Sequence, residues 1–204
     1  MIETKPQQII LASNNCGKIR EFSDIFANIE IKITAQNSLG ISEIDEPYST
    51  FVENALHKAR HCARQSGQMA LADDSGLCVR ALQGRPGVYS ARYAGIPKND
   101  FNNNQKLIAD LSNIADRSAY FYCVLVLVRS ESDPQPIITD GVILGEIIDI
   151  PRGSNGFGYD AHFYLKQYGK TMAELEPQIK NQVSHRRLAI NNLLLKLKEI
   201  TNGT

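Results

Sequence analysis

The fold class follows from one stretch near the start of the chain, Ile9-Ile10-Leu11-Ala12-Ser13-Asn14-Asn15-Cys16-Gly17-Lys18. Its first four residues form a continuously apolar run, which is typical of a buried strand covered on both faces of a sheet. The polar residues that follow form turns readily, and the apolar residues beyond them, Ile19, Phe22, Ile25 and Phe26, recur at helical spacing. The stretch therefore predicts strand, tight polar loop and helix, the opening of an α/β fold.

The rest of the chain continues this alternation. Further strands are predicted over 29–35, 119–129, 137–150 and 161–165, and helices over 50–65, 100–111 and 174–197, the last broken near Pro177 and capped again at Ser184. Residues 69–79 predict a hairpin-like pair that turns at Asp73 to Gly76, and residues 83–95 an ordered loop. We expect one domain over residues 1–204, with an elongated mixed sheet flanked by helices and two lobes around a central substrate cleft.

Composition narrows the class of protein. Lys plus Arg and Asp plus Glu both number 22 in 204 residues, and this zero net charge argues against a nucleic-acid partner. The four cysteines form no C-x-x-C pair and indicate reduced thiols. The first eight residues hold no apolar leader, and the longest apolar run, Phe121–Val128, is too short to span a bilayer. We expect a cytoplasmic protein without a membrane partner.

The polar loop Ser13–Lys18 is a candidate phosphate-binding site. A helix N-terminus offers free amides and a positive dipole end, asparagine side chains add donors, and Lys18 adds a charge. It is not a Walker loop, because Ile19 stands where Ser or Thr would bind Mg²⁺. An ordinary strand–helix connection explains this stretch equally well when it is taken alone.

Three acids and a lysine are candidates for metal and phosphate chemistry. Glu46, Asp73 and Asp74 supply hard oxygen ligands, and Mg²⁺ needs only one or two protein carboxylates when substrate phosphates complete its shell. Adjacent carboxylates on a strand point to opposite faces, so one could bind metal while the other activates water. For Asp73 and Asp74 the alternative is turn chemistry, and for Lys58 a solvated helix face. His57 and His61 lack the Glu of a zinc helix.

Two later segments could bind a nucleobase. Phe157-Gly158-Tyr159-Asp160 offers a ring for stacking and a glycine for close approach, and Ser184-His185-Arg186 offers donors for a base edge. The alternatives are an aromatic core contact and an ordinary helix start.

Taken together and in order, six motifs resemble the inosine triphosphate pyrophosphatase family over nearly the whole chain. They are Ser13-Asn14-Asn15-x-Gly17-Lys18-x-x-Glu21-Phe22, Thr50-Phe51-x-Glu53-Asn54-Ala55-x-x-Lys58-Ala59, Leu71-Ala72-Asp73-Asp74-Ser75-Gly76-Leu77, Pro86-Gly87-Val88-Tyr89-Ser90-Ala91-Arg92-Tyr93-Ala94-Gly95, Gly156-Phe157-Gly158-Tyr159-Asp160 and Ser184-His185-Arg186. Two positions depart from the family pattern: Asn14 stands where Gly is common, and Ala161 where Pro usually follows Tyr-Asp.

The resemblance implies a homodimeric enzyme that hydrolyses ITP, dITP and XTP to the monophosphate and pyrophosphate with Mg²⁺, and so cleanses the nucleotide pool. It implies that Ser13, Asn14, Asn15, Cys16, Gly17, Lys18 and Lys58 hold the triphosphate, that Glu46 and Asp74 bind Mg²⁺, that Asp74 accepts a proton beside Asp73, and that Ser75, Phe157, Gly158, Tyr159, Asp160, Lys180, His185 and Arg186 hold the nucleoside. Glu43 and Asp45 are alternative metal ligands.

Selectivity is expected at the purine 6-position. Donors from Arg186, His185 or a backbone amide near Phe157 would pair with O6 of hypoxanthine or xanthine and would oppose the amino group of adenine. Two competing classes are a nucleotide-binding protein without hydrolysis and a Maf-like pyrophosphatase acting on modified pyrimidines. The three acids favour an enzyme over the first, and Ser184-His185-Arg186 speaks against the second.

Overall fold

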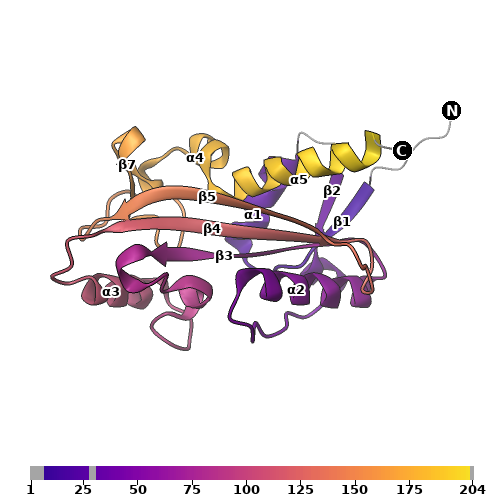
Figure 1. Cartoon of the computed structure of the whole chain (residues 1–204), viewed down its shortest axis with the longest axis horizontal. Helices are drawn as coiled ribbons and strands as arrows, with labels where there is room; N and C mark the ends of the chain where they lie inside the picture. The colour runs from indigo at the N-terminus through magenta and orange to yellow at the C-terminus, as the bar shows by residue number, and fades with distance from the viewer. Residues whose placement is uncertain (1–6, 28–30, 203–204) are drawn as a thin grey trace. The chain divides into compact units, whose positions relative to one another are not determined.

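A computed structural model of the chain describes residues 7–27 and 31–202. Its seven strands form one sheet in the order β2-β1-β3-β4-β5-β6-β7, with β1 parallel to β2 and β3 and with β6 antiparallel to β5 and β7 (Figure 1). The strands are β1 (Gln7–Leu11), β2 (Ile31–Ala35), β3 (Ala70–Val79), β4 (Ser118–Val128), β5 (Ile137–Ile147), β6 (Phe163–Leu165) and β7 (Lys170–Thr171). The helices are α1 (Cys16–Phe26), α2 (Phe51–Ser66), α3 (Asp100–Asp110), α4 (Pro177–Val183) and α5 (His185–Asn202). The predicted α/β class with a mixed, helix-flanked sheet is confirmed.

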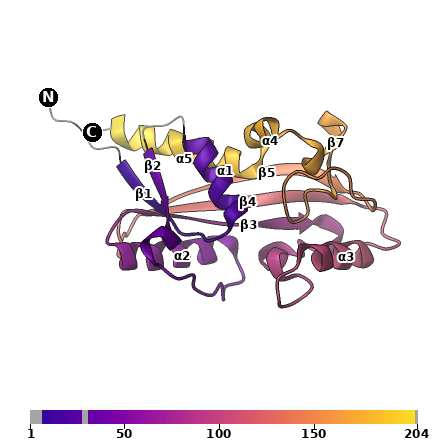
Figure 2. The ribbon, with the colours of Figure 1, turned by 180° about the vertical axis from the view of Figure 1, so that it is seen from behind.

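The chain divides into two compact units. Unit 1 comprises residues 1–74, 124–140 and 189–204, and unit 2 comprises residues 75–123 and 141–188. In unit 1, α1 and α5 lie on one side of the strands and α2 on the other (Figure 2). The α5 helix is tied to β5, since Thr139 Oγ1 donates to the carbonyl of Ala189 and Lys196 Nζ to that of Ile138. Helices on both faces explain why Ile9–Leu11 reads as a continuous apolar run.

Unit 2 has its own hydrophobic core. Leu107 and Leu111 of α3 and its following turn pack with Leu77, Phe121 and Phe163 from three strands, and all five side chains are buried. α3 and α4 lie on opposite sides of these strands (Figures 1 and 2). The loop predicted over 83–95 contains a 3-10 helix, η3 (Gly87–Arg92), which packs against α3.

The predicted hairpin over 69–79 is wrong. Residues 70–79 form the single strand β3, and nine of its ten residues are buried. Asp73-Asp74-Ser75-Gly76 therefore lies within an extended strand, although its residue types favour a turn when they are exposed. Burial on both sides of the strand outweighs this local preference, because a turn would leave buried backbone groups without partners.

Other boundaries follow local signals. α2 begins after Thr50, whose side chain accepts from Glu53 N, and ends at Gly67 with a φ of 64°. Pro177 starts α4 instead of breaking a helix, and the interruption falls at Ser184. The strand predicted over 29–35 is observed as Ile31–Ala35, and residues 29 and 30 lie outside the described residues.

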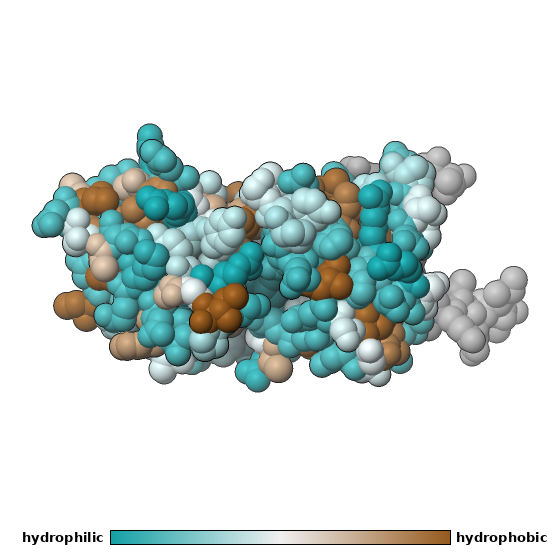
Figure 3. Space-filling model, turned by 90° about the horizontal axis from the view of Figure 1, so that it is seen from below, coloured by the Kyte–Doolittle hydropathy of each residue, from teal (hydrophilic) through white to brown (hydrophobic). Residues whose placement is uncertain are grey.

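The surface is mainly hydrophilic on the face that Figure 3 shows, with hydrophobic residues in small separate groups. No helix among the described residues has the length and hydropathy needed to cross a membrane.

Candidate active site

The loop between β1 and α1 is held by short-range and long-range hydrogen bonds. Asn15 caps α1, and its Oδ1 accepts from Lys18 N at 3.0 Å, while Asn15 N donates to Ser13 Oγ at 3.3 Å. Asn14 N donates to Glu43 Oε1 at 3.0 Å, and Asn14 Oδ1 accepts from Gln36 Nε2 at 3.2 Å. The amides in the first turn of a helix have no carbonyl within it to donate to. Since Asn15 Oδ1 takes the Lys18 amide, the amides of Cys16 and Gly17 are the donors suited to phosphate.

Asp73 and Asp74 are each paired with a different lysine of unit 1. Lys18 Nζ lies 2.8 Å from Asp73 Oδ2, whereas Lys58 Nζ lies 3.7 Å from Asp74 Oδ1 and 2.5 Å from Glu46 Oε1. This split is what alternation along a strand predicts for neighbouring residues. Lys18 of α1 and Lys58 of α2 are thus both brought to β3. For Lys58, this favours a role in a functional site over a place on a solvated helix face.

Burial and neighbouring charges shift the pKa values of Asp74 and Lys58. Asp73 is 1% and Asp74 4% exposed, and burial raises the pKa of Asp74 to about 6. The charges of Glu46 and Asp73 act in the same direction, while Lys58 and Lys18 oppose them. Burial opposes the charged form of Lys58, but the neighbouring carboxylates outweigh it, so the pKa of Lys58 is raised and its ammonium stays charged.

Two of the candidate metal ligands in the acidic segment before α2, Glu46 and Glu43, make different contacts. Glu46 and Asp74 share the Lys58 ammonium, whereas Glu43 is engaged by the backbone of Asn14. Buried Asn54 fixes the end of the segment, since its side chain accepts from Tyr48 N and donates to Tyr48 O. The geometry favours Glu46 over Glu43 as the partner of Asp74.

The donor set fits Mg²⁺ of the kind that relies on substrate oxygens. Glu46 and Asp74 are hard carboxylate ligands that both approach the Lys58 ammonium. No group of three or more His, Cys, Asp or Glu side chains able to hold a metal occurs in the described part of the chain. Mg²⁺ commonly takes one or two carboxylates and completes its shell with phosphate and water.

In unit 2, Phe157 is flanked by cations. Lys180 Nζ lies 5.2 Å and the Arg186 guanidinium carbon 5.4 Å from the centre of the Phe157 ring. Lys180 also pairs with buried Asp160 at 2.8 Å, and Asp160 Oδ2 accepts from Phe157 N at 3.0 Å. Gly156 is required here, because a Cβ on it would lie 2.2 Å from Asp160 Oδ2. The loop 156–160 is therefore pre-formed around an internal ion pair.

The Ser184-His185-Arg186 segment lies at the start of α5 and belongs to unit 2. Arg186 Nη2 donates to Ser75 Oγ at 3.0 Å, and the His185 ring stacks on Phe121 at 5.0 Å between centroids. The structure thus brings Ser75, Phe157, Asp160, Lys180 and Arg186 into one connected set.

Ser90 is a positioning residue that the motif analysis quoted without a role. Its Oγ accepts from Leu77 N at 2.9 Å and donates to Gly87 O at 2.6 Å, and its carbonyl accepts from the Tyr159 hydroxyl at 2.8 Å. Buried Ser90 therefore ties β3 and η3 to the loop that carries Phe157. The bond to Gly87 is local, but those to Leu77 and Tyr159 span 13 and 69 residues, so no local pattern could have revealed them.

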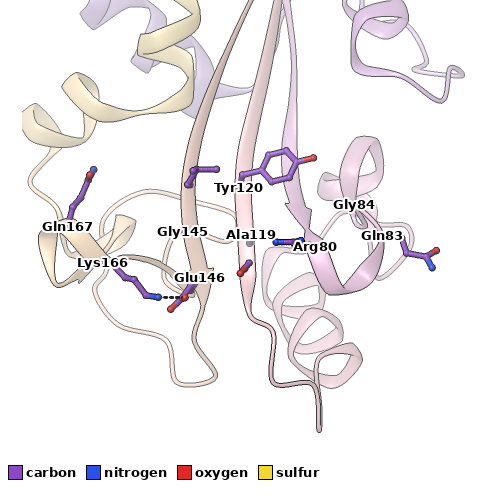
Figure 4. Close-up of a pocket in the computed structure, with 11 residues that line it drawn as sticks. Arg80, Gln83, Gly84, Ala119, Tyr120, Gly145, Glu146, Lys166 and Gln167 are labelled. Carbon is purple, nitrogen blue, oxygen red and sulfur yellow. Dashed lines mark ion pairs between the residues drawn. The ribbon is translucent and has the colours of Figure 1, made fainter.

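Unit 2 also contains a cavity of about 760 Å³, which is lined by residues from Arg80 on one side to Lys166 on the other (Figure 4). Tyr120 and Leu144 line it, and Lys166 pairs with Glu146 at 2.5 Å. None of its lining residues is among the predicted site residues, so its volume alone does not make it the site.

Fold and site together define a class: an α/β protein with two lysine-paired carboxylates on one strand and a pre-formed aromatic loop. A family model described as the Ham1 family matches residues 9–196, and the chain belongs to this family. The resemblance drawn from the motifs is confirmed.

Named relatives agree with this assignment. The dITP/XTP pyrophosphatase of Burkholderia pseudomallei is 57% identical over 196 residues, which cover 95% of this chain and 94% of that protein. That of Neisseria meningitidis is 55% identical over 194 residues, covering 95% and 98%. The solved structure of a Ham1 protein from Coxiella burnetii matches with a TM-score of 0.88 at 48% identity, covering 95% of this chain and 99% of that chain.

Proposed function

We propose that this protein is a Mg²⁺-dependent nucleoside triphosphate pyrophosphatase that hydrolyses ITP, dITP and XTP to the monophosphate and pyrophosphate. The observation that supports this most is the cluster in which half-buried Lys58 lies between Glu46 and buried Asp74, next to the Lys18–Asp73 pair. A nucleotide-binding protein without hydrolysis would have no use for three clustered carboxylates, which bury charge at a cost. The names of the relatives, dITP/XTP pyrophosphatase, support the same reaction.

The triphosphate is bound by groups of unit 1. In the loop Ser13–Lys18, the Cys16 and Gly17 amides at the start of α1 and the ammonium groups of Lys18 and Lys58 neutralise its charge as pyrophosphate leaves, because phosphoryl transfer depends mainly on positioning and charge stabilisation. Glu46 and Asp74 would hold Mg²⁺, which would supply further charge neutralisation and acidify water bound to it. Asp74 accepts the proton of the water that attacks the α-phosphorus, and Asp73 positions Lys18.

The nucleoside is bound by groups of unit 2. Phe157 stacks on the base, and Asp160 and Lys180 hold the loop in shape. Two backbone amides near Phe157 are already engaged, since Phe157 N donates to Asp160 and Gly158 N to Asp100. We therefore assign recognition of purine O6 to the side chains of His185 and Arg186.

The remaining expectations are part of the same proposal. We propose that the 204 residues act as one domain, that the protein is a homodimer, and that it cleanses the nucleotide pool of the cytoplasm. The arrangement of two lobes around a central substrate cleft stays a prediction.

Pyrophosphate release from ITP tests the reaction directly. We expect release with Mg²⁺ and a fall of at least about 100-fold after chelation with EDTA. Mass analysis of the products should give monophosphate and pyrophosphate. Diphosphate and phosphate instead would contradict cleavage between the α and β phosphates.

Selectivity tests the assignment of the base edge. At matched Mg²⁺ we expect kcat/KM for ITP to exceed that for ATP by at least about 100-fold, since buried donors facing an amino group are left unpaired. XTP and GTP measured alongside report on the 2-position. Equal kcat/KM for ATP and ITP would rule out recognition through O6.

A further inference from the structure

Gly158, at the centre of the aromatic loop, is held from both sides by α3. Its amide donates to Asp100 Oδ2 at 2.8 Å, and its carbonyl accepts from Asn104 Nδ2 at 2.9 Å. Asp100 and Asn104 are four residues apart and thus face the same way on the helix. One helix therefore fixes both peptide groups of a single residue.

The helix is itself anchored where it makes these contacts. Asn99 caps it by accepting from Asn102 N at 2.9 Å, and Asn104 Nδ2 also donates to the carbonyl of Asp100 at 2.9 Å. The two side chains therefore approach Gly158 from a helix whose first turn is itself hydrogen-bonded.

Holding Gly158 sets the direction of its neighbours. The Asp100 bond fixes the peptide between Phe157 and Gly158, and the Asn104 bond fixes the peptide between Gly158 and Tyr159. Gly158 has a φ of 62°, a conformation that side chains rarely adopt, and nothing lies within 4 Å of where its Cβ would stand. The glycine is thus needed for the backbone direction and not for lack of space.

We propose that Asp100 and Asn104 are positioning residues for nucleoside binding, which act by orienting Phe157 through Gly158. This rests on the proposed function, in which Phe157 stacks on the base. It extends the nucleoside site to α3, a helix to which no sequence motif assigned a role. The α3 contacts lie within unit 2, so they should affect the nucleoside and leave binding of the bare triphosphate unchanged.

Each substitution in the test changes one bonding group toward Gly158. Asn104→Asp replaces the donor facing the Gly158 carbonyl by an acceptor, and Asp100→Ala removes the acceptor for its amide. Asp100→Asn keeps an acceptor and should rescue. Asn102→Asp is the matched control, because Asn102 is exposed on the same helix and only its backbone takes part in the cap.

We expect Asn104→Asp and Asp100→Ala to raise KM for ITP by about tenfold, since each leaves one group of Gly158 without its partner. The inhibition constant of inorganic tripolyphosphate, which lacks a nucleoside, should stay within about twofold of the wild type. Asp100→Asn and Asn102→Asp should resemble the wild type in both. Equal rises in the two constants, or no rise in KM, would overturn the proposal.

A second measurement needs no catalysis. Exchange of the Gly158 amide proton, followed by NMR, should be faster in Asp100→Ala than in Asn102→Asp, and unchanged exchange would show that the bond does not hold the loop. Failure of the proposed function is recognised separately, because the wild type would then release no pyrophosphate from ITP.

Discussion

We expect replacement of Asp74 by Asn to lower the rate of pyrophosphate release from ITP by about 10³-fold at saturating Mg²⁺. The substitution would remove the proposed metal ligand and proton acceptor together while it preserves shape. Steady-state rates for the purified variant measure the loss. Asp140→Asn is the control, because it removes one exposed carboxylate from unit 1 and should leave the rate unchanged. Turnover of Asp74→Asn near that of the wild type would exclude the proposed role.

The same substitution should stabilise the metal-free protein at neutral pH. The pKa of Asp74 is about 6 in the fold against an ordinary 3.8, so the folded state binds this proton more tightly than the unfolded state. The contribution of Asp74 to the free energy of unfolding therefore grows by about 3 kcal/mol as pH falls from about 7 to 4. Asp74→Asn removes this dependence. Urea unfolding in EDTA at several pH values should show the gap between the two proteins closing as pH falls.

Gly76→Ala should destabilise the protein by at least about 3 kcal/mol. A Cβ at Gly76 would lie 2.4 Å from the Gly87 carbonyl oxygen and 2.5 Å from Ser90 Oγ. The first atom is backbone, and the second is committed to Leu77 N, so neither can move without breaking a bond. Denaturant unfolding measures the loss.

Gly67→Ala provides the comparison for this substitution. Gly67 has a φ of 64° but nothing within 4 Å of its Cβ position, so only backbone strain of about 1 kcal/mol is expected. If Gly76→Ala lowered the free energy of unfolding no more than Gly67→Ala, η3 would have shifted to make room for the added Cβ, which would contradict the prediction.

Much of the fold could be predicted because its signals are local. The apolar run Ile9–Leu11, the cap at Thr50 and the helical spacing over α3 each lie within a few residues of the element they specify. The separation of Asp73 from Asp74 was likewise predictable, because strand side chains alternate whatever lies around them.

The predictions that were wrong or missing concern residues whose partners are distant in sequence. Asp73 and Asp74 tolerate a buried strand because Lys18 arrives from α1 and Lys58 from α2, and neither contact is visible in the turn-like sequence around them. The bond from Asn104 to Gly158 spans 54 residues and follows no spacing rule. Such contacts require the tertiary structure, so positioning residues are harder to predict than the groups they position.

The ammonium of Lys58, set between Glu46 and Asp74, has a consequence for how the protein matures. Without a counter-ion, the buried carboxylate of Asp74 and the half-buried one of Glu46 would repel each other and oppose folding. Here the chain carries its own counter-ion on α2, so a newly synthesised molecule has no need of a divalent ion to complete its fold. In the proposed function, Mg²⁺ would be required only when a triphosphate brings the remaining oxygen ligands.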